Sequence, residues 1–304
     1  MKLWIVYRSV GTENAKNRPP FYSKKLALAS FLRAVENAGV ETGVLFVNDG
    51  PIPEDRLSMM SAAGEIVPIN GGSNRASYRW VLRLPRLRGW APDDLVWFAE
   101  DDYLYTADAF AELVEAAKRL LDADYFAVYS ELRFAQWATR WHPRISDRTR
   151  ADGDDRAVPI GRVRWYRAVS TTSTFGARVR TLVADEWLLR NAPFVGGAFD
   201  HATCLAYQGC RPFEWRRLTD IPASSRWPGP LGEPARRITL ATLRALLNSV
   251  ALALPENRRR VLVAPDPDLA THMETGLLAP GTDWEAEAEA VRAWSPSGSL
   301  AASL

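Results

Sequence analysis

The sequence contains very little cysteine, and this limits what can hold the fold together. Cys204 and Cys210 are the only two in 304 residues, which excludes a disulfide framework and a Cys-x-x-Cys metal clamp. A chain with so few cysteines is typical of a reducing compartment. We therefore expect a cytoplasmic protein whose stability comes from an ordinary apolar core.

Long uncharged apolar runs are also missing. The N-terminal run has five residues before Arg8, too few for the core of a signal peptide. The most apolar later stretch, 238–254, is interrupted by Arg244 and Asn248 and predicts an amphipathic or buried helix instead of a membrane span. Contact with an anionic membrane surface stays open, because arginines flank this stretch: Arg236, Arg237 and Arg258 to Arg260.

The chain has almost no net charge. The 38 Lys and Arg against 36 Asp and Glu give a net charge of +2, which argues against a nucleic-acid-binding protein. Residues 133–180 nevertheless hold 11 arginines and no lysine against 4 aspartates, a local charge of +7. Clustered arginine suits multidentate contacts to phosphate or carboxylate, although a solvated face explains any single arginine equally well.

What is present is an ordinary globular composition, 47% hydrophobic and 24% charged, with strands and helices alternating along the first half. This rhythm predicts an α/β fold: a Rossmann-like, mainly parallel twisted sheet flanked by helices in a single large domain. Strands are expected at 3–7, 43–47, 65–69, 95–99 and 124–129, and helices at 24–37, 74–82 and 106–121. Pro68 suggests that the strand over 65–69 lies at an edge of the sheet or ends early.

The second half is less regular. Residues 138–162 are rich in Arg and Asp and predict a long loop or lid. Helices are expected at 178–191 and 199–208, a proline-rich loop at 222–234, and a flexible tail at 295–304.

Chemically useful residues follow three of the predicted strands. Asp49 follows the second, Gly71-Gly72-Ser73 the third, and Glu100-Asp101-Asp102 the strand over 95–99. Ligands of open α/β sheets bind beyond the carboxyl ends of the strands. Three adjacent carboxylates there suit Mg²⁺ or Mn²⁺, or else form an acidic turn before a helix. Strand alternation would place Glu100 and Asp102 on one face and Asp101 on the other.

Two nucleotide-binding motifs are absent. The sequence has no GxxxxGK[ST], and no GxGxxG follows the first strand. Their absence weakens the interpretations as an ATPase and as a dinucleotide-dependent dehydrogenase.

The segment Trp97-Phe98-Ala99-Glu100-Asp101-Asp102-Tyr103-Leu104 resembles the DxD-type motif of GT-A-fold nucleotide-sugar glycosyltransferases. Further segments are similar to a bacterial, family 2-like group with this fold: Arg18-Pro19-Pro20-Phe21-Tyr22-Ser23-Lys24, Ser170-Thr171-Thr172-Ser173-Thr174-Phe175, Thr271-His272-Met273-Glu274 and Leu278-Ala279-Pro280-Gly281-Thr282-Asp283-Trp284. The resemblance spans residues 1 to about 290 in order. A well-formed Gln-x-x-Arg-Trp motif is lacking, so processive polymerisation is not expected.

The resemblance implies a metal site and a donor site. Asp102 would bind a divalent metal, Mn²⁺ or Mg²⁺, with Glu100 or Asp101 reaching the metal or the ribose. His272, expected in a turn after a strand over 260–264, would be a metal or diphosphate ligand. Asp49 would pair with the base or ribose, unless it only forms an Asx-turn. The other donor contacts implied are Arg8, Arg18 and Lys24 to the diphosphate, and Gly71 and Gly72 where the backbone approaches the donor.

Transfer to an acceptor needs a general base. Asp200, at the start of a predicted helix, is the candidate, although a carboxylate there is also a common N-cap. Asp185 and Glu186 are the fallback pair, more simply explained as a solvated helix face. The hydroxyls of residues 170–174 could contact sugar hydroxyls or simply bond within a strand.

These observations favour a metal-dependent, hexosyltransferase-type glycosyltransferase that moves a sugar from a nucleotide-sugar donor, UDP-sugar favoured, to an unidentified acceptor hydroxyl. Inverting, non-processive chemistry is preferred. Residues 1–130 would form the donor-binding half, and 131–294 the acceptor-binding half with the metal-ligand turn. The alternatives are a nucleotidyltransferase acting on a sugar phosphate and a non-catalytic carbohydrate-binding protein of the same fold.

Overall fold

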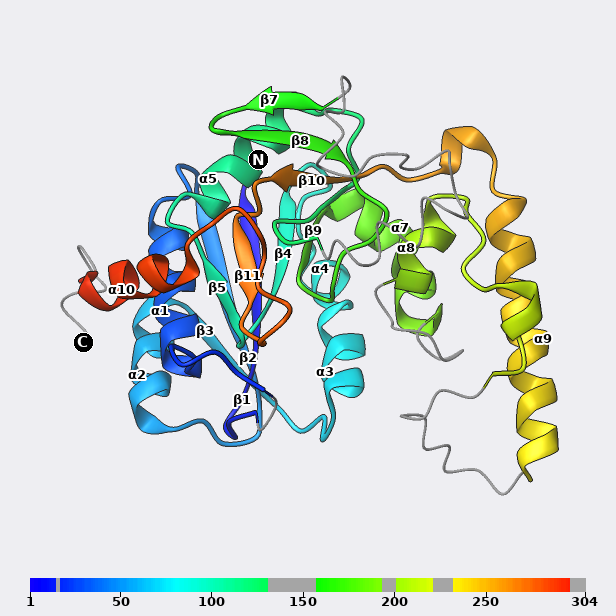
Figure 1. The fold of residues 1–304 in the computed structure, drawn as a ribbon, viewed down its shortest axis with the longest axis horizontal. Helices are drawn as coiled ribbons and strands as arrows, with labels where there is room; N and C mark the ends of the chain where they lie inside the picture. Colours follow the sequence, from blue (N-terminus) through cyan, green and yellow to red (C-terminus); the bar gives the residue numbers. More distant parts are fainter. Residues whose placement is uncertain (15–16, 131–156, 193–200, 221–231, 296–304) are drawn as a thin grey trace.

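A nine-stranded sheet forms the centre of the molecule (Figure 1), with the order β3-β2-β1-β4-β9-β6-β10-β8-β7. The computed structural model describes residues 1–14, 17–130, 157–192, 201–220 and 232–295. In this part of the chain, every strand of the sheet except β8 and β9 runs in the same direction. The strands are β1 (Leu3–Val10), β2 (Thr42–Asp49), β3 (Glu65–Ile69), β4 (Leu95–Glu100), β6 (Tyr125–Phe126), β7 (Val158–Ile160), β8 (Val163–Arg167), β9 (Phe175–Arg178) and β10 (Leu262–Asp266). The predicted α/β fold with a mainly parallel sheet is therefore confirmed.

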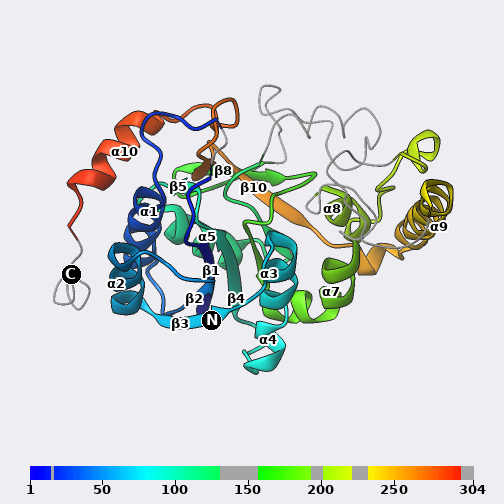
Figure 2. The same cartoon turned by 90° about the horizontal axis from the view of Figure 1, so that it is seen from below.

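Helices cover both faces of the sheet (Figure 2). One apolar core lies under α1 (Lys24–Glu36), α2 (Glu54–Ala63), α5 (Ala109–Arg119) and α10 (Trp284–Ala293). The other lies under α3 (Asn74–Val81), α4 (Leu84–Leu87), α7 (Val179–Asn191) and α8 (His201–Tyr207). Helices on both faces explain why the central strands read as continuous apolar runs.

Local sequence signals set the ends of α1. The Ser23 hydroxyl accepts a hydrogen bond from the amide of Leu26 at 3.0 Å and caps the helix. Leu28 and Phe31 are fully buried on the side that faces the sheet. Gly39 follows with φ 68°, a left-handed conformation that favours glycine.

Both edge strands of this sheet contain an exposed proline, Pro68 in β3 and Pro159 in β7. Pro68 lies opposite Asn48 of β2, and Pro159 lies opposite Arg164 of β8. The prediction that the strand over 65–69 is an edge strand is thus confirmed.

Two local predictions are wrong, and one helix was missed. Helix α2 was not predicted, because its sequence has no clear apolar stripe. The end of the predicted 138–162 loop is β7, which pairs with β8 in a hairpin that turns at Gly161, φ 61°. His272 does not lie in a turn; it ends β11 (Ala270–His272), which forms a separate two-stranded sheet with β5 (Tyr103–Tyr105).

Helix α9 (Glu233–Leu252) lies at the outer end of the molecule next to α8 (Figure 1). Two 3₁₀ helices, Trp215–Arg217 and Glu256–Arg258, precede and follow it. None of the helices in the described part of the chain is long and apolar enough to cross a membrane.

Candidate functional site at the carboxyl ends of β1 and β4

The parallel pairing of β1 with β4 brings Arg8 directly opposite Glu100. Strand β4 ends at Glu100, and Asp101 and Asp102 form the turn that leads into β5. Because β4 ends at Glu100, the alternation expected of a strand does not extend to Asp101 and Asp102, and each of the three acids has its own cation partner.

Glu100 is held from two sides. Its Oε1 atom accepts a hydrogen bond from Arg8 Nη2 at 2.7 Å, and its Oε2 atom accepts one from the Ser173 hydroxyl at 2.6 Å. Thr174 donates to the same oxygen at 3.2 Å. Arg8 also contacts the Asn74 side-chain oxygen at 2.5 Å, so Glu100 and the start of α3 share one buried guanidinium.

Asp101 is tied into the framework. Its Oδ2 atom accepts hydrogen bonds from the Lys24 ammonium at 2.8 Å, the Val10 amide at 2.9 Å and the Ser9 hydroxyl at 3.0 Å. Burial raises the pKa of Asp101, and Lys24 only partly offsets this. These contacts join β1, α1 and the β4–β5 turn, so the structure places Asp101 as an anchor of the turn.

Asp102 carries two basic partners on one oxygen atom. Its Oδ2 lies 2.9 Å from Arg18 Nη2 and 3.0 Å from His272 Nε2. Burial would raise the pKa of Asp102, but the hydrogen bonds and charges of His272 and Arg18 outweigh burial and hold it well below its usual range. Asp102 is therefore ionised at neutral pH.

Short strands fix the position of His272, which is 170 residues from Asp102 in sequence. In the pairing of β11 with β5, His272 lies opposite Tyr103, and the two rings stack with centroids 5.0 Å apart. The amide of Met273 donates to the Asp102 carbonyl at 3.0 Å. Glu274 lies 3.9 Å from His272 Nδ1, on the side of the ring away from Asp102.

Arg18 links the N-terminal loop to this corner. Its second amino group donates to the Met273 carbonyl at 2.6 Å, and its guanidinium stacks on Tyr22, 4.4 Å from the ring centre. The cations predicted to contact a diphosphate thus all lie here, each paired with one acid of the 100–102 triplet: Arg8 with Glu100, Lys24 with Asp101, and Arg18 with Asp102.

Asp49 shapes the neighbouring loop. Its Oδ1 atom accepts hydrogen bonds from the amides of Gly71 at 2.8 Å and Gly72 at 3.1 Å. Gly72 has φ 69°, and a side chain at Gly71 would begin 2.8 Å from the Asp49 carboxylate. The Asp49 carboxylate thus bonds to the backbone of the β3–α3 loop, and no Asx-turn is needed to explain its position.

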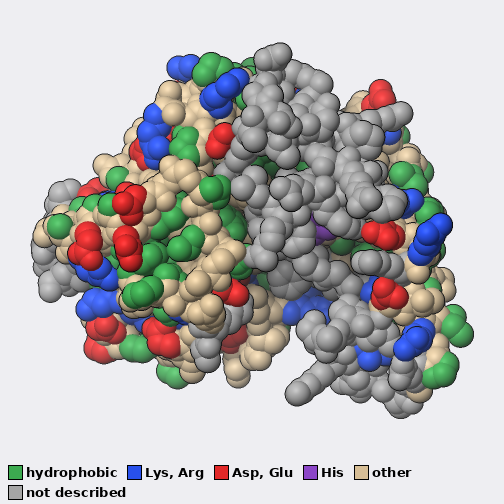
Figure 3. Space-filling view, in the orientation of Figure 1, with side chains coloured by type: hydrophobic (Ala, Val, Ile, Leu, Met, Phe, Trp, Pro, Cys, Tyr) green, Lys and Arg blue, Asp and Glu red, His purple; other side chains and the backbone are tan. Residues whose placement is uncertain are grey.

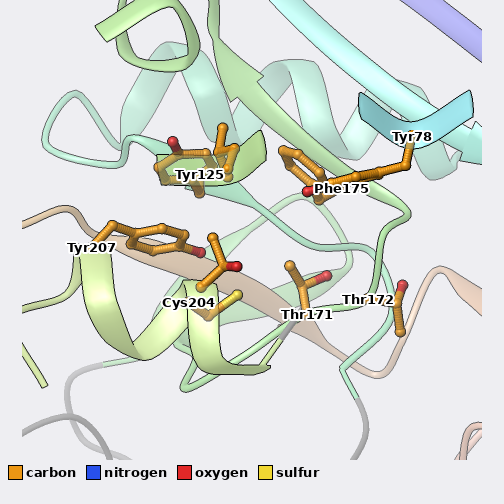
Figure 4. A pocket seen from close by; sticks show the side chains of 9 residues that line it. Tyr78, Tyr125, Thr171, Thr172, Phe175, Cys204 and Tyr207 are labelled. Carbon is orange, nitrogen blue, oxygen red and sulfur yellow. The ribbon is translucent and has the colours of Figure 1, made fainter. Parts of the chain in front are cut away.

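A small cavity of about 10 Å³, with room for roughly one water molecule, lies next to the segment that precedes β9 (Figure 4). Helices α3, α7 and α8 and the segment before β9 line it with aromatic and hydroxyl side chains, among them Tyr78, Thr171, Thr172 and Tyr207. Ser173 and Thr174, which hold Glu100, belong to the same segment. The hydroxyl-rich residues 170–174 therefore do not form a strand but connect the cavity to the acidic triplet.

The predicted bases have different outcomes. Asp200 lies outside the described residues. Asp185 accepts two hydrogen bonds from Arg260, both at 2.9 Å, and one from the Tyr125 hydroxyl at 2.8 Å. Glu186 is paired with Arg86 and Arg190. Asp185 is thus a structural anchor and not part of a solvated helix face.

Sequence reasoning missed several residues of this corner: Ser9, Asn74, Tyr103 and Glu274. Ser9 and Asn74 carry a detectable signal, because they follow the first strand and the glycine loop. Tyr103 is an apolar strand residue by pattern, and its role comes from contacts that no pattern shows: it stacks on His272 and donates a hydrogen bond to the Thr172 hydroxyl at 2.9 Å.

A carboxylate and an imidazole 3.0 Å apart form a donor pair that fits Mn²⁺ or Mg²⁺, with Glu274 positioned to orient the imidazole. No group of three or more His, Cys, Asp or Glu side chains in the described ranges is arranged to hold a metal. Such ions commonly use one or two protein ligands and complete their shell with water and substrate phosphates.

No known family model matches this chain, and no curated protein is similar to it. Solved structures with a similar course of the chain include an active-site mutant of the galactosyltransferase LgtC (14% identity, 99% of this chain and 95% of that one, TM-score 0.41). Another is mouse xyloside xylosyltransferase 1 (11%, 64% and 73%, TM-score 0.35). A third is CMP:2-keto-3-deoxy-manno-octonic acid synthetase with CTP (16%, 96% and 98%, TM-score 0.36). These TM-scores are low, so a function has to be supported by the residues of the site and not by these similarities.

Proposed function

We propose that this protein is a metal-dependent glycosyltransferase of the hexosyltransferase type, which uses a nucleotide-sugar donor, with UDP-sugar favoured. Sugar transfer to an acceptor hydroxyl would be inverting and non-processive. The contact between His272 Nε2 and Asp102 Oδ2, 3.0 Å across 170 residues, is the observation that carries the proposal. It supplies a carboxylate oxygen and an imidazole nitrogen as a metal-ligand pair at the carboxyl end of β4, where open α/β sheets bind nucleotides.

The residues around that pair suit a diphosphate. Arg8, Arg18 and Lys24 are largely buried and converge on the β4–β5 turn, so their charges act in a region of low effective dielectric. Arg18 is held by Asp102 and by a carbonyl, and its paired donors fit phosphate oxygens. Asp102 and His272 would hold the metal ion, which, when bound, stabilises charge developing on the departing diphosphate.

Other residues would position the two substrates. Asp49 fixes the Gly71–Gly72 backbone, which would lie against the donor nucleotide. The hydroxyl-rich residues 170–174, two of which bond to Glu100, would contact sugar hydroxyls. Asp200 is the proposed base, taking the proton of the acceptor hydroxyl as that oxygen attacks the anomeric carbon.

The base assignment has its own test. Asp200→Asn should leave nucleotide-sugar binding unchanged, because Asp200 is not among the proposed donor contacts, and should lower transfer about 100-fold or more. Calorimetry with the donor and a single-turnover transfer assay measure the two effects. Retained transfer would show that another group is the base or that the stereochemistry is retaining.

The function itself is tested with the purified full-length protein and a panel of nucleotide sugars. Release of nucleoside diphosphate is followed with Mn²⁺, with Mg²⁺ and with a chelator. We expect metal-dependent release that is strongest with one UDP-sugar. Absence of both donor hydrolysis and donor binding under all metal conditions would refute the proposal. Pyrophosphate release from a nucleoside triphosphate and a sugar phosphate would instead identify a nucleotidyltransferase.

A further inference from the structure

Helix α9 is unusual because, among its residues whose side chains the structure describes, Arg237 is the only exposed one that carries a charge. The buried face holds Leu240, Arg244 and Asn248, a spacing of four residues that marks one side of the helix. On the opposite side, Ile238, Leu246, Val250 and Leu252 are 68%, 60%, 55% and 50% exposed. The remaining residues of the outer face are Pro234, Ala235, Thr239, Thr242, Ala245, Ser249 and Ala253. A helix that meets only water normally has charged and polar residues on this side.

The few hydroxyl groups on this face point their hydrogen bonds back into the helix. Thr239, Thr242 and Ser249 each donate to the carbonyl four residues earlier, at 2.9, 3.0 and 2.9 Å. These hydrogen bonds satisfy the hydroxyl groups within the helix. They leave the outer face with methyl and methylene groups as its main contact surface.

The polar contacts of α9 are instead directed at the protein body. Arg244 donates to the Leu218 and Asp220 carbonyls at 2.7 and 2.5 Å. The Asn248 amide makes two hydrogen bonds to the Phe213 backbone, both at 2.9 Å. These hydrogen bonds fix the helix in its orientation. A loose attachment therefore does not explain why its apolar side faces outward.

The surroundings of the face are basic. Arg236 and Arg237 lie near the start of α9 and Arg258 lies after its end, and Arg237 and Arg258 are exposed. Two further arginines of this region, Arg244 and Arg260, bond to the protein body and do not contribute to this surface. Trp215 and Arg216, in the 3₁₀ helix that follows the Phe213 contact, are also exposed. Hydrophobic and basic side chains, with some acidic ones beside them, lie along the edge of the molecule that α9 forms (Figure 3).

We propose that this surface, the outer face of α9 with its flanking arginines and Trp215, binds the interface of an anionic lipid membrane. An uncharged aliphatic face, basic ends and an interfacial tryptophan are the features by which a helix lies in the plane of a membrane surface. A second copy of this chain fits less well, because pairing two such faces in either direction would place arginine-rich ends against each other.

The test measures sedimentation of the full-length protein with large unilamellar vesicles of phosphatidylcholine, with and without about 30% phosphatidylglycerol. We expect partition mainly onto the anionic vesicles, weakened by high salt. Leu246→Gln with Val250→Gln should lower the partition coefficient on the order of tenfold or more. Leu87→Gln with Leu121→Gln, two leucines 61% and 75% exposed elsewhere, is the matched control and should have little effect.

A second variant isolates the charge. Arg236→Gln with Arg237→Gln should weaken binding several-fold at low salt and have a smaller effect at high salt. Equal binding to neutral and anionic vesicles, equal losses in the α9 and control variants, or no vesicle binding would overturn the proposal. So would a solution dimer that Leu246→Gln and Val250→Gln dissociate, since it would make the face an interface between copies. These measurements need no enzymatic activity, so they are independent of the proposed function.

Discussion

Two clusters of ion pairs in this molecule use the same residue types in different ways. In the first, Asp185 receives both donors of Arg260 and the Tyr125 hydroxyl, so each Asp185 oxygen has a fixed partner. In the second, Arg18 and His272 meet on a single oxygen of Asp102. A closed, bidentate cluster stabilises the fold. Two basic side chains that share one carboxylate oxygen can instead separate from it when a phosphate or a metal ion binds. The comparison predicts a structural role for the first and a chemical role for the second.

The largest effect is expected from Asp102→Asn. The amide is a poor metal ligand and lacks the charge that pairs with His272 and Arg18, so metal-dependent donor turnover should fall about 1000-fold. Steady-state kinetics with Mn²⁺ measure it, and circular dichroism checks that the fold is retained. Activity close to that of the wild type would remove Asp102 from the chemistry.

Asp185→Asn should show the opposite pattern. Loss of the carboxylate leaves the partly buried Arg260 without its bidentate partner and should lower the free energy of unfolding by about 2 to 3 kcal/mol. The kcat of donor turnover should change less than threefold at a temperature where the variant is folded. Urea unfolding and kinetics on the same sample test both statements. A variant of normal stability that has lost activity would reverse the comparison.

A pH dependence distinguishes the charged and neutral forms of Asp102. Its pKa is held below the usual 3.8, so the ionised form stabilises the fold above that pH, and this contribution is lost as the pH falls further. The free energy of unfolding of the wild type should therefore exceed that of Asp102→Asn by about 2 kcal/mol at about pH 6. The difference should shrink below about pH 4. Urea titrations at several pH values measure it, and a constant difference would contradict the ion pair.

The smallest effect concerns the competition between Arg18 and a metal ion for Asp102. Arg18→Gln removes a positive charge 2.9 Å from the Asp102 oxygen and should increase Mn²⁺ affinity in the absence of nucleotide by about tenfold. Free Mn²⁺ is followed by electron paramagnetic resonance. Arg162→Gln, which removes a cation paired with Asp108, is the control. Unchanged Mn²⁺ affinity would mean that Arg18 does not restrict the site.

The sequence predicted the central strands and the location of the site well, for a local reason. Buried strands such as 95–99 are continuous apolar runs, and acids at their carboxyl ends stand out against them. The parallel arrangement then places Arg8 and Glu100 at one edge, as their register confirms. This part of the site follows from patterns within a few residues.

The remaining geometry depends on contacts that no local pattern contains. Strand β11 has three residues, and its pairing with β5 joins segments about 170 residues apart. The partner of each acid depends on where β4 ends, because a turn at Asp101 breaks the alternation of a strand. For the same reason, the pairing of Arg8, Arg18 and Lys24 with the acidic triplet could not be predicted from the sequence, which indicated only a contact with a diphosphate.

The prolines at the two margins of the main sheet have a consequence for how copies of this protein behave when concentrated. An edge strand offers unpaired amide and carbonyl groups to any other strand, which is a common start of aggregation. Proline has no amide hydrogen, so Pro68 and Pro159 each interrupt that row of donors. Growth of ordered aggregates by strand addition is thereby discouraged at both ends, and replacing either proline with threonine should raise the tendency to form fibrils.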